Sequence, residues 1–175
     1  TGYMLFKRFN RSISKTSPGV ASQNRPSIIF RLADFYLIYA EVANEVNPSD
    51  SRVLTYLNLV RERAGLPKVE ILNPGIVGNK ELQRAAIQRE RQIELATEGQ
   101  RYFDVRRWMI ADKDGEGRQN GYAHGMNVRG TINDTEEFNR VVETEKIVFN
   151  RKMYLQPIPD HEMRKTQNLV QNPGW

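Results

Sequence analysis

The 175-residue sequence contains no cysteine. It can therefore form no disulfide and no thiolate metal site, and a cysteine nucleophile is excluded as well. Long apolar runs are also missing, because the best candidate, FYLIYAEVA, is interrupted by Glu41 and falls short of the roughly 18–20 residues that cross a bilayer. The opening residues TGYMLFKRF lack the long apolar segment and the small-residue cleavage site of a signal peptide.

The sequence also lacks any run of five or more charges of one sign. Its net charge of +5 arises from 26 Lys and Arg against 21 Asp and Glu, and the basic residues alternate with acidic ones. Surfaces that bind nucleic acid instead concentrate basic residues against phosphates, so nucleic acid is not an expected ligand. The length fits one domain, and the content of 39% hydrophobic and 27% charged residues is ordinary for a globular protein.

The spacing of apolar residues predicts a helical hairpin early in the chain. A helix over residues 31–47 ends at Pro48, and a second helix over residues 51–64 is followed by Gly65, where a left-handed cap is expected. Helices joined by so few residues should pack antiparallel, as in tetratricopeptide repeats. The expected core residues are Leu32, Phe35, Tyr39, Val42 and Val46, widened by Tyr36, Ala40 and Ala43, in the first helix, and Val53, Leu57, Val60 and Ala64 in the second.

Further helices are expected over residues 80–98, with Asn79 as the N-cap, and over residues 101–109. The segment 67–78 is expected to be a loop, and residues 111–129 form a loop by composition. Short strands fit the partial alternation in NVRGTI and TEKIVFN. The expected apolar face of the third helix contains Leu82, Ala86, Ile93 and Ala96, together with Arg89.

The stretch RQIELATEGQRYFDVRRW, residues 91–108, mixes charged side chains with residues typical of a core. Glu94 and Glu98 of this stretch and Glu90 just before it lie four residues apart, and like charges at that spacing repel by a few tenths of a kcal/mol unless cations compensate. Guanidinium groups suit carboxylates because two parallel hydrogen bonds form. We interpret the region as an ion network that joins helices, formed by Arg89, Glu90, Arg91, Glu94, Glu98, Arg101, Asp104, Arg106 and Arg107.

A glycosidase site is the alternative interpretation of this region. Glu90 and Glu94, one helical turn apart, meet the carboxylate separation of about 5–10 Å that such enzymes use. A general acid must hold a proton, however, and the surrounding arginines favour the ionised carboxylate. The sequence therefore favours the structural interpretation over catalysis.

Metal sites are not expected either. Residues 112–116 suggest a calcium loop, but the glycine stands at the fourth position instead of the sixth, and the twelfth position is Ala123. The two histidines, His124 and His161, are far apart and lack the spacing of metal ligands. No cofactor is expected.

Several stretches resemble, in the same order, the motifs of SusD/RagB-type outer-membrane nutrient-binding lipoproteins. The late helical signature of that family is matched by RERQIELATEGQRYFDVRRW. An earlier family helix is matched by RLADFYLIYAEVANE, with Asp34 where Glu is usual. Further matches are LNLVRERAGLP, GMNVRG, YLQPIPDHEM and NLVQNPGW, so the resemblance spans nearly the whole chain.

The resemblance implies a mainly α fold of tetratricopeptide-like helical hairpins, with loops and short strands toward the C-terminus. Residues 1–175 would be the C-terminal portion of a SusD-like domain whose N-terminal half lies outside this chain. The full protein would be lipid-anchored, through that missing part, on the cell-surface side of the outer membrane. It would bind glycans without catalysis and pass them to a SusC-like TonB-dependent transporter. A helical-repeat adaptor that binds protein or peptide ligands remains the alternative.

Ligand contacts in this family come from variable loops, which points to residues 111–129 in this chain. The ring of Tyr122 could stack on a sugar, and Asn120, His124 and Arg129 could form hydrogen bonds with hydroxyl groups. A solvated loop without ligand contacts is the competing interpretation. Trp108 and Trp175 are expected to pack against the protein and not to face a ligand.

Overall fold

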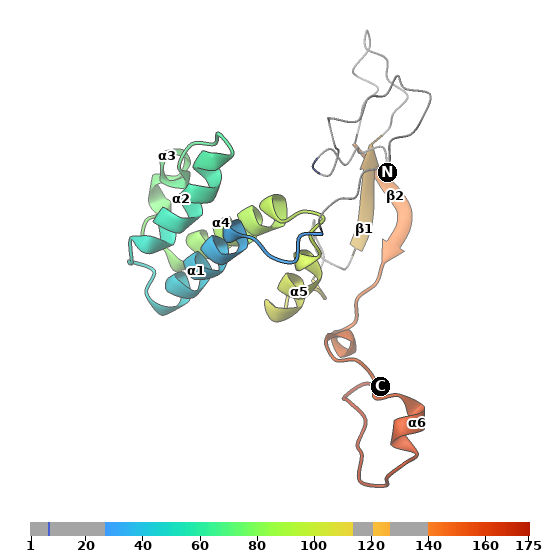
Figure 1. Ribbon diagram of the computed structural model, residues 1–175. Coiled ribbons are helices and arrows are strands. Elements are labelled where there is room, and N and C mark those ends of the chain that lie inside the picture. Colours follow the sequence, from blue (N-terminus) through green and yellow to red (C-terminus); the bar gives the residue numbers. More distant parts are fainter. Residues whose placement is uncertain (1–6, 8–26, 114–120, 127–139) are drawn as a thin grey trace. The chain divides into compact units, whose positions relative to one another are not determined.

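The computed structural model describes residue 7 and residues 27–113, 121–126 and 140–175 (Figure 1). The chain divides into two compact units, one of residues 26–104 and the other of residues 1–25 with 105–175. The elements in chain order are α1 (Leu32–Val46), α2 (Arg52–Arg63), α3 (Val69–Leu72), the 3-10 helix η1 (Pro74–Ile76), α4 (Lys80–Glu94), α5 (Gln100–Arg107), β1 (Gly121–Met126), β2 (Arg140–Ile147), the 3-10 helix η2 (Arg151–Tyr154) and α6 (Asp160–Met163).

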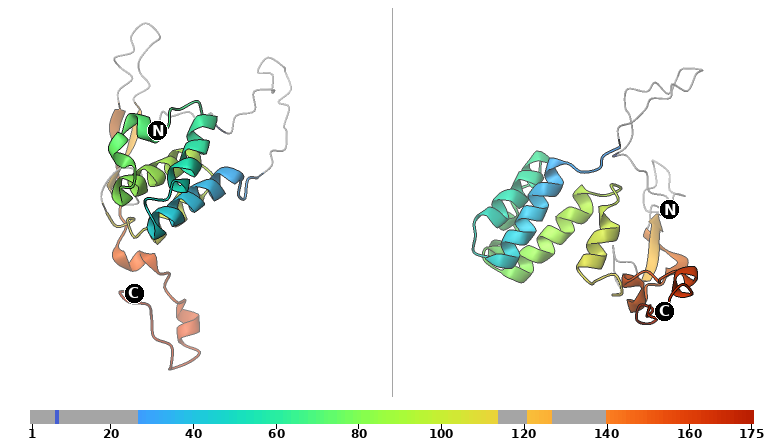
Figure 2. Two further views of the ribbon diagram at one scale, coloured as in Figure 1. Left: turned by 90° about the vertical axis from the view of Figure 1, so that its left-hand side faces the viewer. Right: turned by 60° about the horizontal axis from the view of Figure 1, so that its bottom comes forward.

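Three helices, α1, α2 and α4, make up most of the unit formed by residues 26–104. Helices α1 and α2 form the predicted antiparallel hairpin, and α4 lies alongside both (Figure 2). The predicted mainly α, tetratricopeptide-like fold is thereby confirmed. In the part of the chain that the structure describes, no helix has the length and apolar content of a membrane span.

Local signals set the helix ends largely as predicted. After α2, Gly65 adopts a left-handed φ of 76°, and the N–H of Leu66 donates to the carbonyl of Arg61 at 2.9 Å. Glycine suits this position because a side chain would strain the left-handed backbone. At the start of α4, the side chain of Asn79 accepts a hydrogen bond from the N–H of Leu82 at 3.2 Å. The loop predicted over residues 67–78 instead contains α3 and η1.

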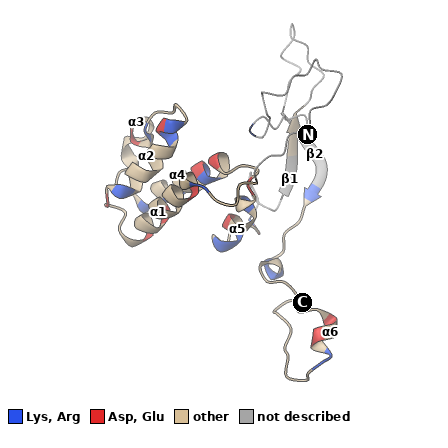
Figure 3. Ribbon diagram, viewed as in Figure 1, with Lys and Arg blue, Asp and Glu red and all other residues tan. Residues whose placement is uncertain are grey.

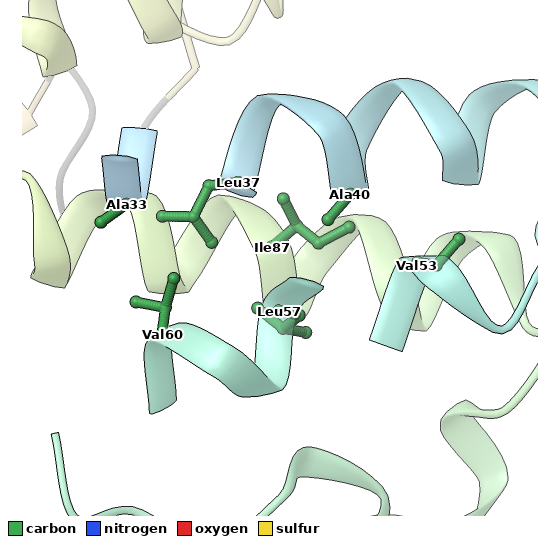
Figure 4. Close-up of a cluster of buried hydrophobic side chains, with 7 residues drawn as sticks. All are labelled: Ala33, Leu37, Ala40, Val53, Leu57, Val60 and Ile87. Carbon is green, nitrogen blue, oxygen red and sulfur yellow. The ribbon is translucent and has the colours of Figure 1, made fainter. Parts of the chain in front are cut away.

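The core of this unit is a small cluster between the three helices (Figure 4). Two alanines and a leucine of α1 meet the apolar face of α2, and one isoleucine of α4 closes the cluster. Because alanine is small, the α1 backbone can approach its neighbours closely. The members are Ala33, Leu37 and Ala40 from α1, Val53, Leu57 and Val60 from α2, and Ile87 from α4.

The predicted core face of α1 is wrong for its five main residues, whereas Ala40 is buried and Tyr36 and Ala43 pack against the core as predicted. The buried residues of this helix are Ala33, Asp34, Leu37, Ala40 and Asn44. The larger apolar side chains lie on another face and are exposed, because α2 and α4 pack on the face that carries the small alanines and Leu37. The exposed residues are Leu32, Phe35, Tyr39, Val42 and Val46. In α2 three of the four predicted core residues are buried, and Ala64 is an exposed C-cap.

The predicted face of α4 is wrong for Leu82 and Ile93, although Ala86 packs against the core, and the predicted helix is too long. The helix ends at Glu94, and the following turn contains two left-handed residues, Thr97 at φ 69° and Gly99 at φ 83°. Its buried residues are Gln83, Ile87, Glu90 and Arg91, while Leu82 and Ile93 are exposed. Charged side chains occupy the buried face because they meet partners of opposite charge there. The next helix, α5, begins one residue earlier than predicted and ends two residues earlier.

The other unit contains a two-stranded antiparallel sheet. Strand β1 pairs with β2, and the register shifts between Tyr122 and His124. The prediction that residues 111–129 form only a loop is therefore wrong, because β1 lies within them. This unit has a small core of its own, which contains Val105, Ala111 and Phe149.

Candidate functional site

One arginine, Arg91 of α4, occupies the centre of the charged region. Its Nε and Nη2 donate to the two carboxylate oxygens of Asp104 at 3.0 and 3.1 Å, and its Nη1 donates to Asp34 of α1 at 2.8 Å. The Arg91 side chain is only 2% exposed. Burial of a guanidinium is costly without anionic partners, and two carboxylates supply them here. Arg91 therefore links α1, α4 and α5.

A second pair connects α4 to the end of α2. Nη1 of Arg61 donates to Glu90 at 2.8 Å, and both side chains are largely buried. The Nε of the same arginine donates to the carbonyl of Pro67 at 3.0 Å. Arg61 thus connects the turn after α2 to α4.

The third part of the network surrounds Arg31, at the N-cap of α1. Its guanidinium donates to both carboxylate oxygens of Glu98 at 2.9 Å and to the carbonyl of Glu94 at 2.6 Å. Arg31 and Arg63 also both donate to the Glu94 carboxylate. The hydrogen bonds to Glu98, followed by those to Glu94, raise the pKa of Arg31 above its usual value. These contacts fix the turn after α4 against the hairpin.

The other arginines predicted for the network differ in their surroundings. Arg89 is exposed and makes no ion pair with another described residue. Arg101 is half-buried in α5. The guanidinium of Arg106 lies 5.0 Å from the ring centre of Phe149, and that of Arg107 lies 4.7 Å from the ring centre of Trp108.

Sequence analysis did not identify the partners that the hairpin supplies. Arg31, Arg61, Arg63 and Asp34 are 29 to 67 residues away from most of the groups they contact. Only their position in the motifs RLAD and RER, each at one end of a helix, could have indicated a role. Figure 3 shows acidic and basic residues interspersed along α4 and α5.

This arrangement suits fixation of helices better than acid–base chemistry. Glu90 and Glu94, the pair that a glycosidase would use, each accept hydrogen bonds from an arginine. A general acid has to carry a proton and direct it at the ligand. Carboxylates engaged by guanidinium groups are directed at those groups instead.

The residues predicted to contact a ligand are only partly within the described structure. Tyr122 and His124 belong to β1, and His124 is half-buried and opposite Val142. Asn120 and Arg129 lie outside the described residues. The prediction that these four residues contact a ligand therefore stays a prediction.

Metal binding finds no support among the residues that the structure describes. They contain no group of three His, Asp or Glu side chains that could hold an ion. Asp112, the first residue of the suggested calcium loop, accepts a hydrogen bond of 2.6 Å from the hydroxyl of Tyr154. This hydrogen bond lowers the pKa of Asp112, and burial together with Asp112 raises the pKa of Tyr154.

An open hollow with mainly apolar walls is found among the described residues of each unit. The hollow in the first unit has a volume of about 230 Å³ and lies between α1 and α2, with Leu32, Tyr36 and Leu59 in its wall. The hollow in the second unit has a volume of about 580 Å³ and is lined by Tyr154, Leu155 and Gly174, among others. Trp175 lies close to the second hollow, where its indole N–H donates to the carbonyls of Lys152 and Leu155 at 3.0 Å.

The fold and the charged region define a tetratricopeptide-like helical protein whose helices are fixed by arginine–carboxylate pairs. The family model described as the SusD family matches residues 1–175, so the chain belongs to the SusD family. The resemblance found in the sequence is thereby confirmed.

Individual relatives agree with this assignment. SusD-like protein P25 of Formosa agariphila is 44% identical over 106 residues, which cover 61% of this chain and 19% of the relative. SusD-like protein P2 of the same organism is 31% identical over 153 residues, covering 85% of this chain and 26% of the relative. The crystal structure of a SusD-like protein from Bacteroides fragilis is similar with a TM-score of 0.68 at 31% identity, covering 85% of this chain and 26% of that one. The chain thus spans about a fifth to a quarter of the length of these relatives.

Proposed function

We propose that this chain is the C-terminal portion of a cell-surface glycan-binding protein that serves nutrient uptake. In this proposal the complete protein captures an oligosaccharide without cleaving it and presents it to a SusC-like TonB-dependent transporter. A lipid on a part of the protein outside these residues would anchor it to the outer membrane. The observation that carries the proposal is the match of the SusD family model to residues 1–175.

The charged region supports the non-catalytic part of this proposal. Its central acids bind arginines of neighbouring helices, and Arg91 is held between Asp34 and Asp104. Residues committed to such contacts contribute to the scaffold. The ligand would then be bound by other parts of the complete protein, with residues 111–129 forming a rim of the site.

Calorimetric titration of the complete protein against a panel of polysaccharides tests the function. We expect one glycan class to bind with micromolar to millimolar affinity, about −4 to −8 kcal/mol. No reducing ends should be released during prolonged incubation. Binding of peptides but of no glycan would instead favour the helical-repeat adaptor. Turnover that is abolished by Glu90→Gln or Glu94→Gln would overturn the non-catalytic assignment.

The proposed complex with a transporter can be tested separately from glycan binding. We expect the complete protein, extracted gently from the outer membrane, to co-purify with a TonB-dependent transporter of the SusC type. Glycan binding without any such complex would retain the capture function and refute the proposed partner.

A further inference from the structure

The side chain of Tyr154 connects two segments that are 42 residues apart in the chain. Its hydroxyl donates to Oδ1 of Asp112 at 2.6 Å and accepts a hydrogen bond from the backbone N–H of Asp112 at 3.2 Å. One hydroxyl therefore binds both the side chain and the backbone of the same residue. Asp112 is the second residue of segment 111–129, the proposed ligand rim, so this contact lies where the rim begins.

The ring of Tyr154 is held in place by a small core. It meets the ring of Phe149 edge to face, with 5.0 Å between the ring centres. Phe149 is only 6% exposed and packs with Val105 and Ala111, and the guanidinium of Arg106 lies 5.0 Å from its ring centre. Edge-to-face contacts favour particular ring orientations. The Tyr154 hydroxyl is therefore presented at a defined position.

The backbone on either side of Tyr154 is fixed by Trp175. The indole N–H donates to the carbonyls of Lys152 and Leu155, both at 3.0 Å, and the Lys152 ammonium lies 4.3 Å from the indole ring centre. Gly174 has a left-handed φ of 87°, and a Cβ there would lie 3.0 Å from Cβ of Lys152. Glycine thus lets the two segments approach closely, and the last residues of the chain support η2 from outside.

The turn after α5 directs the chain toward Asp112. The N–H of Met109 donates to the carbonyl of Arg106 at 3.0 Å, and Met109 has a left-handed φ of 53°. This conformation is strained for residues other than glycine and persists only where surrounding contacts enforce it. The path from α5 into the rim is therefore defined at two points, first by this turn and then by the Tyr154 hydroxyl.

We propose that Tyr154 is a positioning residue for the ligand, which acts through Asp112 by fixing the start of the ligand rim. The inference rests on the proposed function, because it takes residues 111–129 to contact a glycan. A glycan that has to immobilise a segment on binding loses affinity through the conformational entropy of that segment. The contact between Tyr154 and Asp112 restrains the segment in advance and so reduces this loss.

Amide hydrogen exchange of the complete protein tests the contact without any ligand. Tyr154→Phe removes the hydroxyl and keeps the ring, so the packing on Phe149 is retained. Tyr39→Phe is the matched control, because the Tyr39 hydroxyl forms no hydrogen bond with another residue that the structure describes. Exchange at Leu57, in the core of the other unit, should be the same in all three proteins.

We expect the Asp112 amide to exchange at least about tenfold faster in Tyr154→Phe, since the amide loses its hydrogen-bond acceptor. In Tyr39→Phe it should exchange at the native rate. An unchanged rate in Tyr154→Phe would overturn the proposal, as would an equal acceleration in both variants.

Calorimetry with a glycan already shown to bind the complete protein tests the positioning role. We expect Tyr154→Phe to weaken binding about two- to tenfold, the scale of one hydrogen bond. In a Tyr122→Ala background the same substitution should weaken binding less, because residues that act through one segment are not additive. Equal losses in both backgrounds would show that the hydroxyl acts elsewhere, and an unchanged affinity would show that it positions nothing. Either result would overturn the proposal.

Variants of Asp112 test the partner of the hydroxyl. Asp112→Asn keeps an oxygen that can accept from Tyr154, whereas Asp112→Ala removes it. We therefore expect Asp112→Ala to weaken glycan binding and Asp112→Asn to restore most of the affinity. Equal losses in the two variants would contradict the proposed role of the hydrogen bond.

Failure of this inference differs from failure of the proposed function. If glycan binding depends on Tyr122 but Tyr154→Phe changes neither amide exchange nor affinity, the proposed function stands and the inference is refuted. If no glycan binds, the proposed function and the positioning role are both overturned, even where the Asp112 amide responds as expected.

Discussion

Arg91 and Asp104 form a two-pronged pair in which Nε and Nη2 of the arginine each donate to a different carboxylate oxygen. The same guanidinium binds Asp34 of α1, so one cation pairs with two buried carboxylates. Loss of this cation would remove the guanidinium from both carboxylates. Because unpaired buried charges are far more costly than paired ones, Arg91 should dominate the local stability of this unit.

We predict that Arg91→Met lowers the free energy of opening at α1 and α4 by about 3–5 kcal/mol. Hydrogen exchange of the backbone amides in the complete protein would measure it. Arg89→Met is the matched control, because Arg89 lies on the same helix but is exposed, and it should stay within about 0.5 kcal/mol. Similar effects of both variants would show that the Arg91 pairs contribute little.

The Ile87 side chain should contribute strongly to the stability of the three-helix core. It is fully buried between α1 and α2, so truncation leaves a cavity that the helices cannot close. We expect Ile87→Val to cost about 0.5–1.5 kcal/mol and Ile87→Ala about 2–5 kcal/mol, measured by urea unfolding. A cost of Ile87→Ala below that of Ile87→Val would contradict the packing described.

Glu45 should contribute to the loss of folding stability at low pH. Its carboxylate accepts hydrogen bonds from Arg84 at 2.7 and 2.8 Å and pairs with Lys80 at 3.0 Å, which lowers its pKa to about 2. A lowered folded-state pKa contributes stability above the unfolded value of about 4.5, and this contribution is lost as pH falls toward 2. The side chain is 40% exposed, so solvent screening keeps the effect small.

The difference in melting temperature between the complete protein and its Glu45→Gln variant measures this contribution. We predict a difference that is constant above pH 5 and shrinks between about pH 4.5 and 2. A difference that grows on acidification would show that Glu45 opposes folding.

Gly65 is predicted to tolerate substitution poorly for conformational reasons alone. An added Cβ would meet no atom within 4 Å, but the φ of 76° is left-handed. Gly65→Ala should therefore cost roughly 1 kcal/mol in chemical unfolding. Gly75→Ala is the control, because Gly75 has no left-handed φ and its Cβ would lie 3.5 Å from the Asn73 side chain, so this variant should cost less. An equal cost of the two variants would show that the left-handed backbone at Gly65 does not determine the loss of stability.

Tyr122 is the most direct probe of the proposed ligand rim. For a glycan already shown to bind the complete protein, Tyr122→Ala should weaken binding by roughly 0.5–1.5 kcal/mol, the scale of one aromatic contact. Tyr122→Phe keeps the ring and should retain most of the affinity if stacking is responsible. Unchanged affinity in Tyr122→Ala would move the site away from residues 111–129.

The helices were predictable from the sequence because their signals are local. Apolar periodicity, Asn79 at a helix start and Gly65 after a helix end depend on residues a few positions apart, and these predictions agree with the structure. The faces of α1 and α4 were not predictable in this way. Which side of a helix is buried depends on its neighbours, and in α4 the polar residue Arg91 is buried while the apolar Ile93 is exposed.

The acidic residues of the ion network could be predicted from the sequence more readily than the arginines that bind them. Glu90 and Glu94 were identified because like charges four residues apart require compensation. Their partners Arg61, Arg31 and Arg63 come from the first hairpin, 29 to 63 residues earlier in the chain. Spacing on one helix carries no information about such long-range pairs, so the sequence identified only arginines that are close to these glutamates in the chain.

The connection of Arg61 to both Pro67 and Glu90 has a consequence for biosynthesis. The turn after α2 can form as soon as Pro67 has left the ribosome, whereas Glu90 is added 23 residues after Pro67. At about 5–20 residues per second this interval lasts roughly 1–5 s. During that time the hairpin lacks Ile87, and the apolar side chains of its inner face stay accessible to chaperones and to other nascent chains.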